Sequence, residues 1–118
     1  MKLIESSHKK GHKDIFRSYY TSDDALVFYM VDLLALKDGD YCLEPSAGSG
    51  CFIDGLLATG KDINICAIEI SAAAADGLSC KYKDASNIAI TYGDFLQPDR
   101  QSISPVKGFD RIIANPPY

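Results

Sequence analysis

The 118-residue chain has no tryptophan, and none of its apolar runs approaches the roughly 20 residues that a membrane-spanning helix requires. Residues 1–13 are polar and lack the apolar centre of a secretory signal peptide, so the chain carries no sign of export. It also lacks internal repeats and low-complexity tracts. A chain of this length accommodates one domain at most.

Closely spaced cysteine pairs are also missing. The four cysteines are Cys42, Cys51, Cys66 and Cys80, and none of their spacings is typical of a zinc site. We interpret them as reduced, mostly core-forming residues of a cytoplasmic protein, and we predict no metal site.

The charge is unevenly distributed. Residues 1–17 carry five basic and two acidic side chains, whereas the remainder has a net charge of −7, which makes −4 in total. We expect residues 1–16 to be a basic, disordered arm, although contact with phosphate groups is an alternative. The acidic body by itself gives no electrostatic sign of nucleic-acid binding.

Short apolar runs alternate with helical patterns along the rest of the chain. A helix is expected over residues 23–36, capped by Thr21 or Ser22, with apolar residues 26, 27, 30, 33 and 34 on one face. Further helices are expected at 51–58 and 71–80, and strands at 41–44, 63–70, 88–92 and 109–114. This order predicts an α/β domain with a doubly wound parallel sheet of about four strands.

Small residues follow the first expected strand and its final acid, Glu44. The loop consists of Pro45, Ser46, Ala47, Gly48, Ser49 and Gly50. Its glycines let the backbone come close to a ligand at the start of a helix. The spacing is not that of a dinucleotide-binding loop, and Glu44 would repel phosphates but attract an ammonium group.

Acidic residues also follow the next two strands, and such ends share one rim of a parallel sheet. Glu69 comes 25 residues after Glu44, which suits a carboxylate that accepts from ribose hydroxyls. Asp94 can accept from an exocyclic amine, and Phe95 can cover a purine. Taken singly, Glu69 is more often a surface charge and Gly93-Asp94 a turn, but together they predict an adenosine pocket.

The fourth expected strand runs into Asn115-Pro116-Pro117-Tyr118. Two prolines end the strand in a rigid corner, which could also be a simple proline turn. The corner presents the Asn115 amide, the Pro116 carbonyl and an aromatic ring at Tyr118. This set suits a planar substrate that carries an NH₂ group.

The loop from Glu44 to Phe52 and the Asn-Pro-Pro-Tyr corner resemble those of S-adenosylmethionine-dependent methyltransferases that act on exocyclic amines. The nearest resemblance is to the N6-adenine DNA methyltransferases of restriction–modification systems, which have a Rossmann-like fold. Tyr19-Tyr20-Thr21 resembles their N-terminal cofactor motif in the gamma order. The resemblance implies that residues 17–118 are the N-terminal, cofactor-binding half of a methyltransferase domain.

The resemblance also implies a role for each motif residue. Tyr20 and Thr21 would contact the methionine carboxylate, and Glu44 with the loop through Gly50 would hold the methionine amine. The adenosine would lie against Glu69, Ile70, Asp94 and Phe95. The target base would be held by the catalytic corner, Asn115, Pro116, Pro117 and Tyr118.

The implied activity is site-specific N6-methylation of adenine in double-stranded DNA, which a recognition domain beyond residue 118 would read. The same corner also occurs in enzymes that methylate glutamine N5 of release factors and guanine N2 of ribosomal RNA, so these remain alternatives. A non-catalytic cofactor-binding fragment is a further alternative. We expect the chain alone to be inactive and to self-associate through an exposed strand at 109–114.

Overall fold

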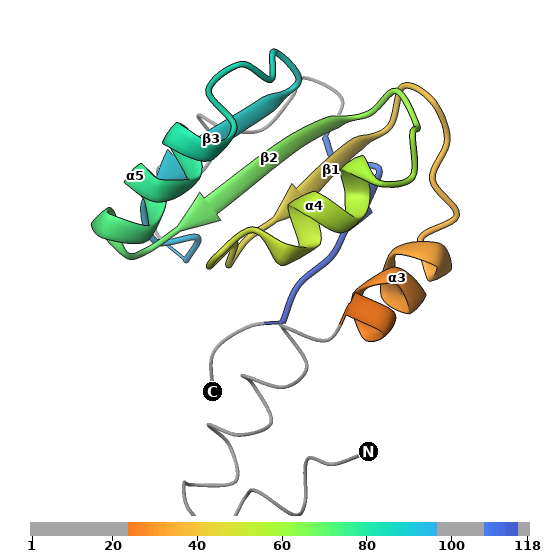
Figure 1. The fold of residues 1–118 in the computed structure, drawn as a ribbon, viewed down its shortest axis with the longest axis horizontal. Helices are drawn as coiled ribbons and strands as arrows, with labels where there is room; N and C mark the ends of the chain where they lie inside the picture. The colour runs from red at the N-terminus through yellow and green to blue at the C-terminus, as the bar shows by residue number, and fades with distance from the viewer. Residues whose placement is uncertain (1–23, 97–107, 116–118) are drawn as a thin grey trace, which may run out of the picture.

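The computed structural model describes residues 24–96 and 108–115 (Figure 1). The elements follow one another in the order that the sequence predicts. They are α3 (Asp24–Leu33), β1 (Tyr41–Glu44), α4 (Cys51–Leu57), β2 (Asn64–Glu69), α5 (Ala72–Lys81), β3 (Ile88–Tyr92) and β4 (Arg111–Ile112).

The four strands form one parallel sheet in the order β3-β2-β1-β4. Leu43 of β1 is level with Cys66 of β2 and with Ile112 of β4. Because every strand runs the same way, the segments that follow the four strands lie at the same end of the sheet, where the carboxyl ends of the strands meet. We call this end of the sheet the strand-end rim.

The core lies between the sheet and the helices. Helices α4 and α5 run across the sheet in Figure 1, and α3 packs against α4. Cys42 pairs with Ile65, so both side chains leave the sheet on the same face, which Ala67 shares two residues along β2. These three residues are buried in one cluster with Ile53 and Leu56 of α4. The run of apolar residues in β2 is therefore explained by burial, as expected for a parallel strand.

Helix α3 differs most from its prediction. It ends at Leu33 rather than near residue 36, and Ala35 beyond it takes a left-handed φ of 50°. The residues it buries are Val27 and Val31, whereas Leu33, which was expected on the inner face, is 66% exposed. The expected caps of this helix, Thr21 and Ser22, lie outside the described residues.

Gly55 explains which side of α3 faces inward. A Cβ at this position would lie 2.6 Å from Cγ1 of Val27 and 3.2 Å from Cγ2 of Val31. A glycine inside a helix lowers its stability by about 0.5–1 kcal/mol relative to alanine. The close packing of α3 on α4 supplies the reason for this glycine.

The fourth strand is shorter than expected. Regular pairing covers only Arg111 and Ile112, although the Ile113 amide still donates to the Leu43 carbonyl at 3.0 Å. Ile113 itself is buried, so this segment belongs to the domain even where the ladder ends. Among the described residues no helix is both long and apolar enough to cross a lipid bilayer.

Candidate functional site

The strand-end rim brings together the predicted site residues that the structure describes. Glu44 ends β1, Glu69 ends β2, Asp94 follows β3 and Asn115 follows β4. Tyr20, Thr21, Pro116, Pro117 and Tyr118 lie outside the described residues, so their predicted roles have no structural counterpart here. Chain topology thus brings into one region acids that are separated by tens of residues in sequence.

Glu44 is buried, with 1% of its surface exposed. Its Oε1 accepts from the Ser46 amide at 2.8 Å and from the Ser46 hydroxyl at 3.3 Å. Its Oε2 is buried without a hydrogen-bond partner among the described residues. A buried carboxylate oxygen in this condition is costly unless a cation or a proton accompanies it.

The pKa of Glu44 reflects this environment. Burial and, to a smaller extent, the charge of Glu69 raise the pKa against the opposing hydrogen bonds from Ser46, and the net result is a pKa of about 7. Near neutral pH the side chain is therefore divided between its protonated and ionised forms. A positively charged ligand group would favour the ionised form.

The loop after Glu44 has the backbone shape that its glycines predict. Gly48 has a φ of 57° and Gly50 a φ of 92°, both in the left-handed region. The Ala47 amide donates to the Ile68 carbonyl at 2.9 Å, which ties the buried middle of the loop to β2. Pro45 and Ser46, which lie between Glu44 and Ala47, are half-buried.

Glu69 holds two backbone amides at once. Its Oε1 accepts from the Gly48 amide at 2.8 Å, and its Oε2 accepts from the Ser71 amide at 2.7 Å. The side chain is 8% exposed, so it is not the surface charge that Glu69 alone would suggest. Each oxygen has a second lone pair that is still able to accept from a hydroxyl group.

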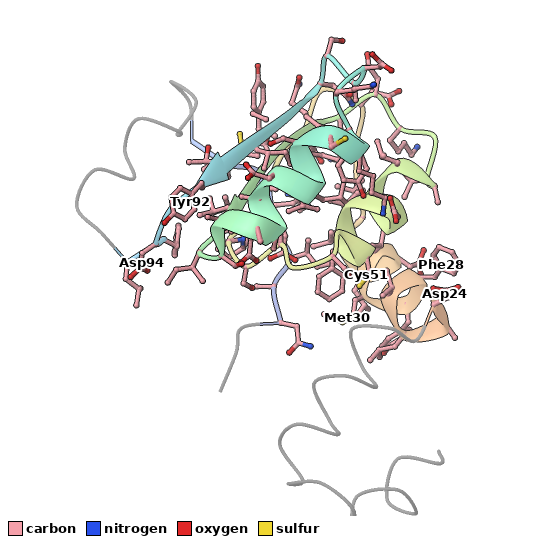
Figure 2. The ribbon with its side chains drawn as sticks, turned by 60° about the vertical axis from the view of Figure 1, so that its left-hand side comes forward. Asp24, Phe28, Met30, Cys51, Tyr92 and Asp94 are labelled. Carbon is pink, nitrogen blue, oxygen red and sulfur yellow. The ribbon has the colours of Figure 1, made fainter. Side chains whose placement is uncertain are left out.

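Beside Glu69, the rim offers apolar surface. Ile70 is 63% exposed and Tyr92, at the end of β3, is 65% exposed. Figure 2 shows Tyr92 and Asp94 together at this end of β3. Asp94 accepts from the Leu96 amide at 2.9 Å through Oδ1, and Phe95 is half-buried next to it. An aromatic or apolar ligand could cover part of this surface.

Sequence reasoning missed one group that matters at the rim. Tyr82, just after α5, is buried and directs its hydroxyl to Asp54 and to the Gly50 carbonyl. Burial and the hydrogen bond to Asp54 raise the pKa of Tyr82 to about 12, so the phenol stays protonated. No local motif connects Tyr82 with Gly50, because 32 residues separate them.

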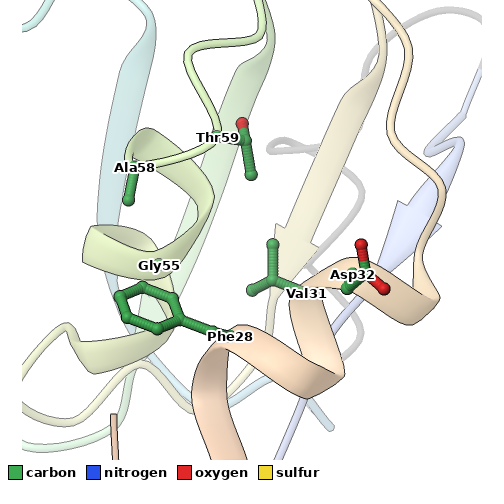
Figure 3. A pocket seen from close by; sticks show the side chains of 6 residues that line it. All are labelled: Phe28, Val31, Asp32, Gly55, Ala58 and Thr59. Atoms are coloured by element: carbon green, nitrogen blue, oxygen red, sulfur yellow. The ribbon is translucent and has the colours of Figure 1, made fainter. Parts of the chain in front are cut away.

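Two cavities are formed by described residues other than the acidic residues of the rim. One of about 240 Å³ opens between α3 and α4, where Phe28 lies beside Gly55, and Thr59 is also part of its lining (Figure 3). The other, of about 410 Å³, lies between Gly48 and Ser49 of the loop and α5. Neither is lined by Glu44 or Glu69.

The four cysteines all lie in the described part of the chain, and none of them forms a disulfide. Cys42 is fully buried, as expected of a core residue, and burial together with nearby Asp40 and Asp110 raises its pKa to about 11. Cys80 instead lies exposed on α5, which corrects the interpretation of that residue. Within residues 24–96 and 108–115, no three His, Cys, Asp or Glu side chains gather as a metal site.

The chain is similar in sequence to two type II methyltransferases. It is 30% identical to M.CvrRI of Paramecium bursaria Chlorella virus XZ-6E, over all of this chain and 30% of that protein. It is 28% identical to M.AccI of Acinetobacter calcoaceticus, over 98% of this chain and 21% of that protein.

A third relative is the ribosomal RNA small subunit methyltransferase A of Pseudomonas putida, which is 24% identical over 87% of this chain and 38% of its own length. The chain therefore spans well under half the length of these relatives. No protein-family model matches the chain.

Three solved structures share the fold. TrmN of Thermus thermophilus superposes with a TM-score of 0.67 at 22% identity, over 82% of this chain and 29% of its own. The mycolic acid cyclopropane synthase CmaA1 gives 0.66 at 18% identity, over 80% and 33%. Aeropyrum pernix fibrillarin, solved with natively bound S-adenosyl-L-methionine, gives 0.60 at 21% identity, over 75% and 43%. The parallel α/β fold predicted from the sequence is confirmed.

Proposed function

Because the chain has the Rossmann-like fold of S-adenosylmethionine-dependent methyltransferases and is distantly related to DNA and ribosomal RNA methyltransferases, we propose that it binds S-adenosylmethionine at its strand-end rim. The observation that supports this proposal most strongly is the environment of Glu44. This side chain is a buried carboxylate with one oxygen that has no partner within the described part of the chain, and it precedes a loop whose glycines are left-handed. An ammonium group on the ligand would supply the partner that this oxygen lacks.

The other described residues fit the same ligand. The second lone pairs of the Glu69 oxygens suit two ribose hydroxyls, and the exposed surface of Ile70 suits an adenine ring. Asp94, at the end of β3, would accept from the adenine amine. When bound, S-adenosylmethionine supplies a methyl group on a positively charged sulfur. The part of the rim is to bind this molecule and orient it.

For the substrate we propose adenine N6 in double-stranded DNA, as in a restriction–modification system. The names of the two type II relatives and the Asn-Pro-Pro-Tyr sequence support this choice. The Asn115 amide oxygen would accept a hydrogen from the target amine and stabilise the charge that develops there during transfer. The base would have to leave the duplex to reach this corner.

A second candidate substrate is ribosomal RNA, because one relative is a ribosomal RNA methyltransferase. Glutamine in a protein stays a third possibility, since it also presents a planar amide nitrogen. Recognition of any of them would involve regions beyond residue 118, in line with the greater length of the relatives. We therefore expect the 118-residue chain alone to transfer no methyl groups to duplex DNA.

Calorimetric titration with S-adenosylmethionine and S-adenosylhomocysteine tests the binding proposal. We expect micromolar binding of both, and a clear loss of affinity in Glu44→Gln. Asp76→Asn is the matched control, because Asp76 is an exposed acid on α5. A folded chain that binds neither compound would contradict the proposal.

The substrate is tested with a longer protein that contains this chain and labelled S-adenosylmethionine, offered duplex DNA, ribosomal RNA and a glutamine-containing peptide in parallel. Transfer to the RNA or to the peptide alone would overturn the DNA assignment. In the same protein, Asn115→Ala should lower turnover by about 100-fold or more, as for loss of a group that stabilises transition-state charge. Cofactor affinity should stay unchanged, and a parallel loss of both would remove Asn115 from the catalytic assignment.

Self-association through residues 109–114 also stays a prediction. β4 lies at an edge of the four-stranded sheet, and Ile112 is 58% exposed. An edge strand with free backbone groups can pair with a second chain. Sedimentation of the 118-residue chain should show concentration-dependent dimers, and a monomer at all concentrations would contradict this.

A further inference from the structure

The end of α5 contacts the start of α4 through Tyr82, a buried side chain. Tyr82 is 9% exposed, and its hydroxyl donates to Oδ1 of Asp54 at 2.5 Å and to the Gly50 carbonyl at 3.2 Å. The hydroxyl carries one hydrogen, which these two acceptors share. Both acceptors belong to the turn where the glycine loop becomes helix α4.

Gly50 is shaped around this contact. Its φ of 92° is left-handed, and a Cβ in its place would lie 2.7 Å from the Tyr82 hydroxyl oxygen and 3.0 Å from Cδ2 of Leu78. Its amide donates to the Ala47 carbonyl and its carbonyl accepts from the Asp54 amide. Because α4 has no side-chain cap at Gly50, the tyrosine is the side chain that meets this backbone.

Asp54 is itself oriented by a neighbour of Tyr82. Nζ of Lys81 lies 2.7 Å from Oδ2 of Asp54 and 5.2 Å from the centre of the Tyr82 ring. Both charged side chains are about half exposed, so the ion pair adds little stability. Its effect is to point the other carboxylate oxygen at the hydroxyl.

Besides the Ala47 bond to β2, the loop is thus held at both of its glycines. At Gly48 it is bound by Glu69 from β2, and at Gly50 it contacts Tyr82 from the end of α5. We propose that Tyr82 is a positioning residue of the cofactor site, whose hydroxyl keeps residues 45–50 in the shape that receives the ligand. The inference rests on the proposed function, since it concerns the same loop.

The expected effect follows from preorganisation. A loop that is already ordered loses less entropy when a ligand binds. Removing one hydroxyl costs about one net hydrogen bond, so the dissociation constant for S-adenosylhomocysteine should rise about fivefold to tenfold. The aromatic ring would still fill its place against Leu78, so global stability should change far less than loop order.

The test compares Tyr82→Phe with Tyr41→Phe in the 118-residue chain. Tyr41 begins β1, at the opposite end of the sheet from the rim, and is 40% exposed. The first readout is hydrogen exchange at the hydrogen-bonded amides of Gly48, Gly50 and Asp54, with the Ile65 amide of β2 as the reference for global opening. The second is calorimetric affinity for S-adenosylhomocysteine.

Faster exchange at the three loop amides in Tyr82→Phe only, with Ile65 unchanged, would support the proposal. Equal acceleration at all four amides, no change at any, or a variant that does not fold would overturn it, because the hydroxyl would then act on the whole domain or on nothing. If the unsubstituted chain binds no S-adenosylhomocysteine, the proposed function fails. The exchange result still decides whether Tyr82 orders the loop.

Discussion

The ends of β1 and β2 carry the same side chain in two different conditions. Glu44 and Glu69 are both buried at the rim, 1% and 8% exposed. Glu69 accepts one backbone amide on each oxygen, whereas Glu44 has one oxygen with Ser46 and one with no partner among the described residues. Glu69 is satisfied by the protein itself, whereas the second oxygen of Glu44 still requires a proton or a cation.

The largest effect is expected from removing the satisfied acid. Glu69→Ala leaves the Gly48 and Ser71 amides without their acceptor. Hydrogen bonds to a charged group contribute about 1.5–3 kcal/mol each, so loss of the two bonds should lower the free energy of unfolding by about 3–6 kcal/mol. Urea denaturation measures this loss, and affinity for S-adenosylhomocysteine should fall with it. Unchanged stability and affinity would contradict the structural and binding roles assigned to Glu69.

Replacing the unsatisfied acid should separate stability from binding. Glu44→Gln removes a buried charge, one oxygen of which has no partner among the described residues, so at pH 8 the free energy of unfolding should stay level or rise. Affinity for S-adenosylmethionine should fall by about tenfold or more, since a charged hydrogen bond contributes about 1.5–3 kcal/mol. If Glu44→Gln instead lost as much stability as Glu69→Ala, the contrast between the two acids would be wrong.

The same contrast predicts a pH dependence. The pKa of Glu44 is raised by burial from 4.5 to about 7, so the folded state holds this proton more tightly than the unfolded state. Stability from this group is fully present below pH 4.5 and is lost as the pH rises through 7, by up to about 3 kcal/mol. Denaturation between pH 5 and 8 measures the slope, and Glu44→Gln should flatten it.

Ligand binding should remove the proton that Glu44 holds in the folded state. If an ammonium group pairs with Glu44, binding near pH 6.5 should release a fraction of one proton. Titrations in two buffers with different ionisation enthalpies would give different apparent heats. Equal heats in both buffers would mean that Glu44 does not change its protonation on binding.

The smallest expected effect lies far from both acids. Ala35 has a φ of 50°, which costs about 1–2 kcal/mol for a residue with a Cβ. Ala35→Gly relieves this strain but enlarges the entropy of the unfolded chain, so a net gain of about 0.5 kcal/mol is expected. Thermal denaturation should show a small rise in melting temperature. If Ala35→Gly also changed cofactor affinity, affinity would depend on the overall stability of the domain. The loss of affinity expected in Glu44→Gln could then not be assigned to Glu44 alone.

Much of the architecture could be predicted because it depends on local pattern. Short, mainly apolar segments between helical patterns placed β1, β2 and β3 within one residue of their observed bounds. The inner face of α3 could not be predicted, since the helix is apolar nearly all round and only Gly55 of α4 selects Val27 and Val31. The length of β4 was overestimated, because apolar character alone does not show where backbone pairing stops in an outer strand of the sheet.

The sequence by itself determined the parallel α/β fold and the acids and glycines that follow its strands, because residue type and spacing decide these locally. Only the tertiary structure decided that both oxygens of Glu69 accept from backbone amides. It also decided that one oxygen of Glu44 has no hydrogen-bond partner among the described residues. It alone showed that Tyr82 contacts Gly50 from 32 residues away. Burial and hydrogen-bond partners arise from chain segments that meet only after folding, and such meetings leave no local pattern to recognise.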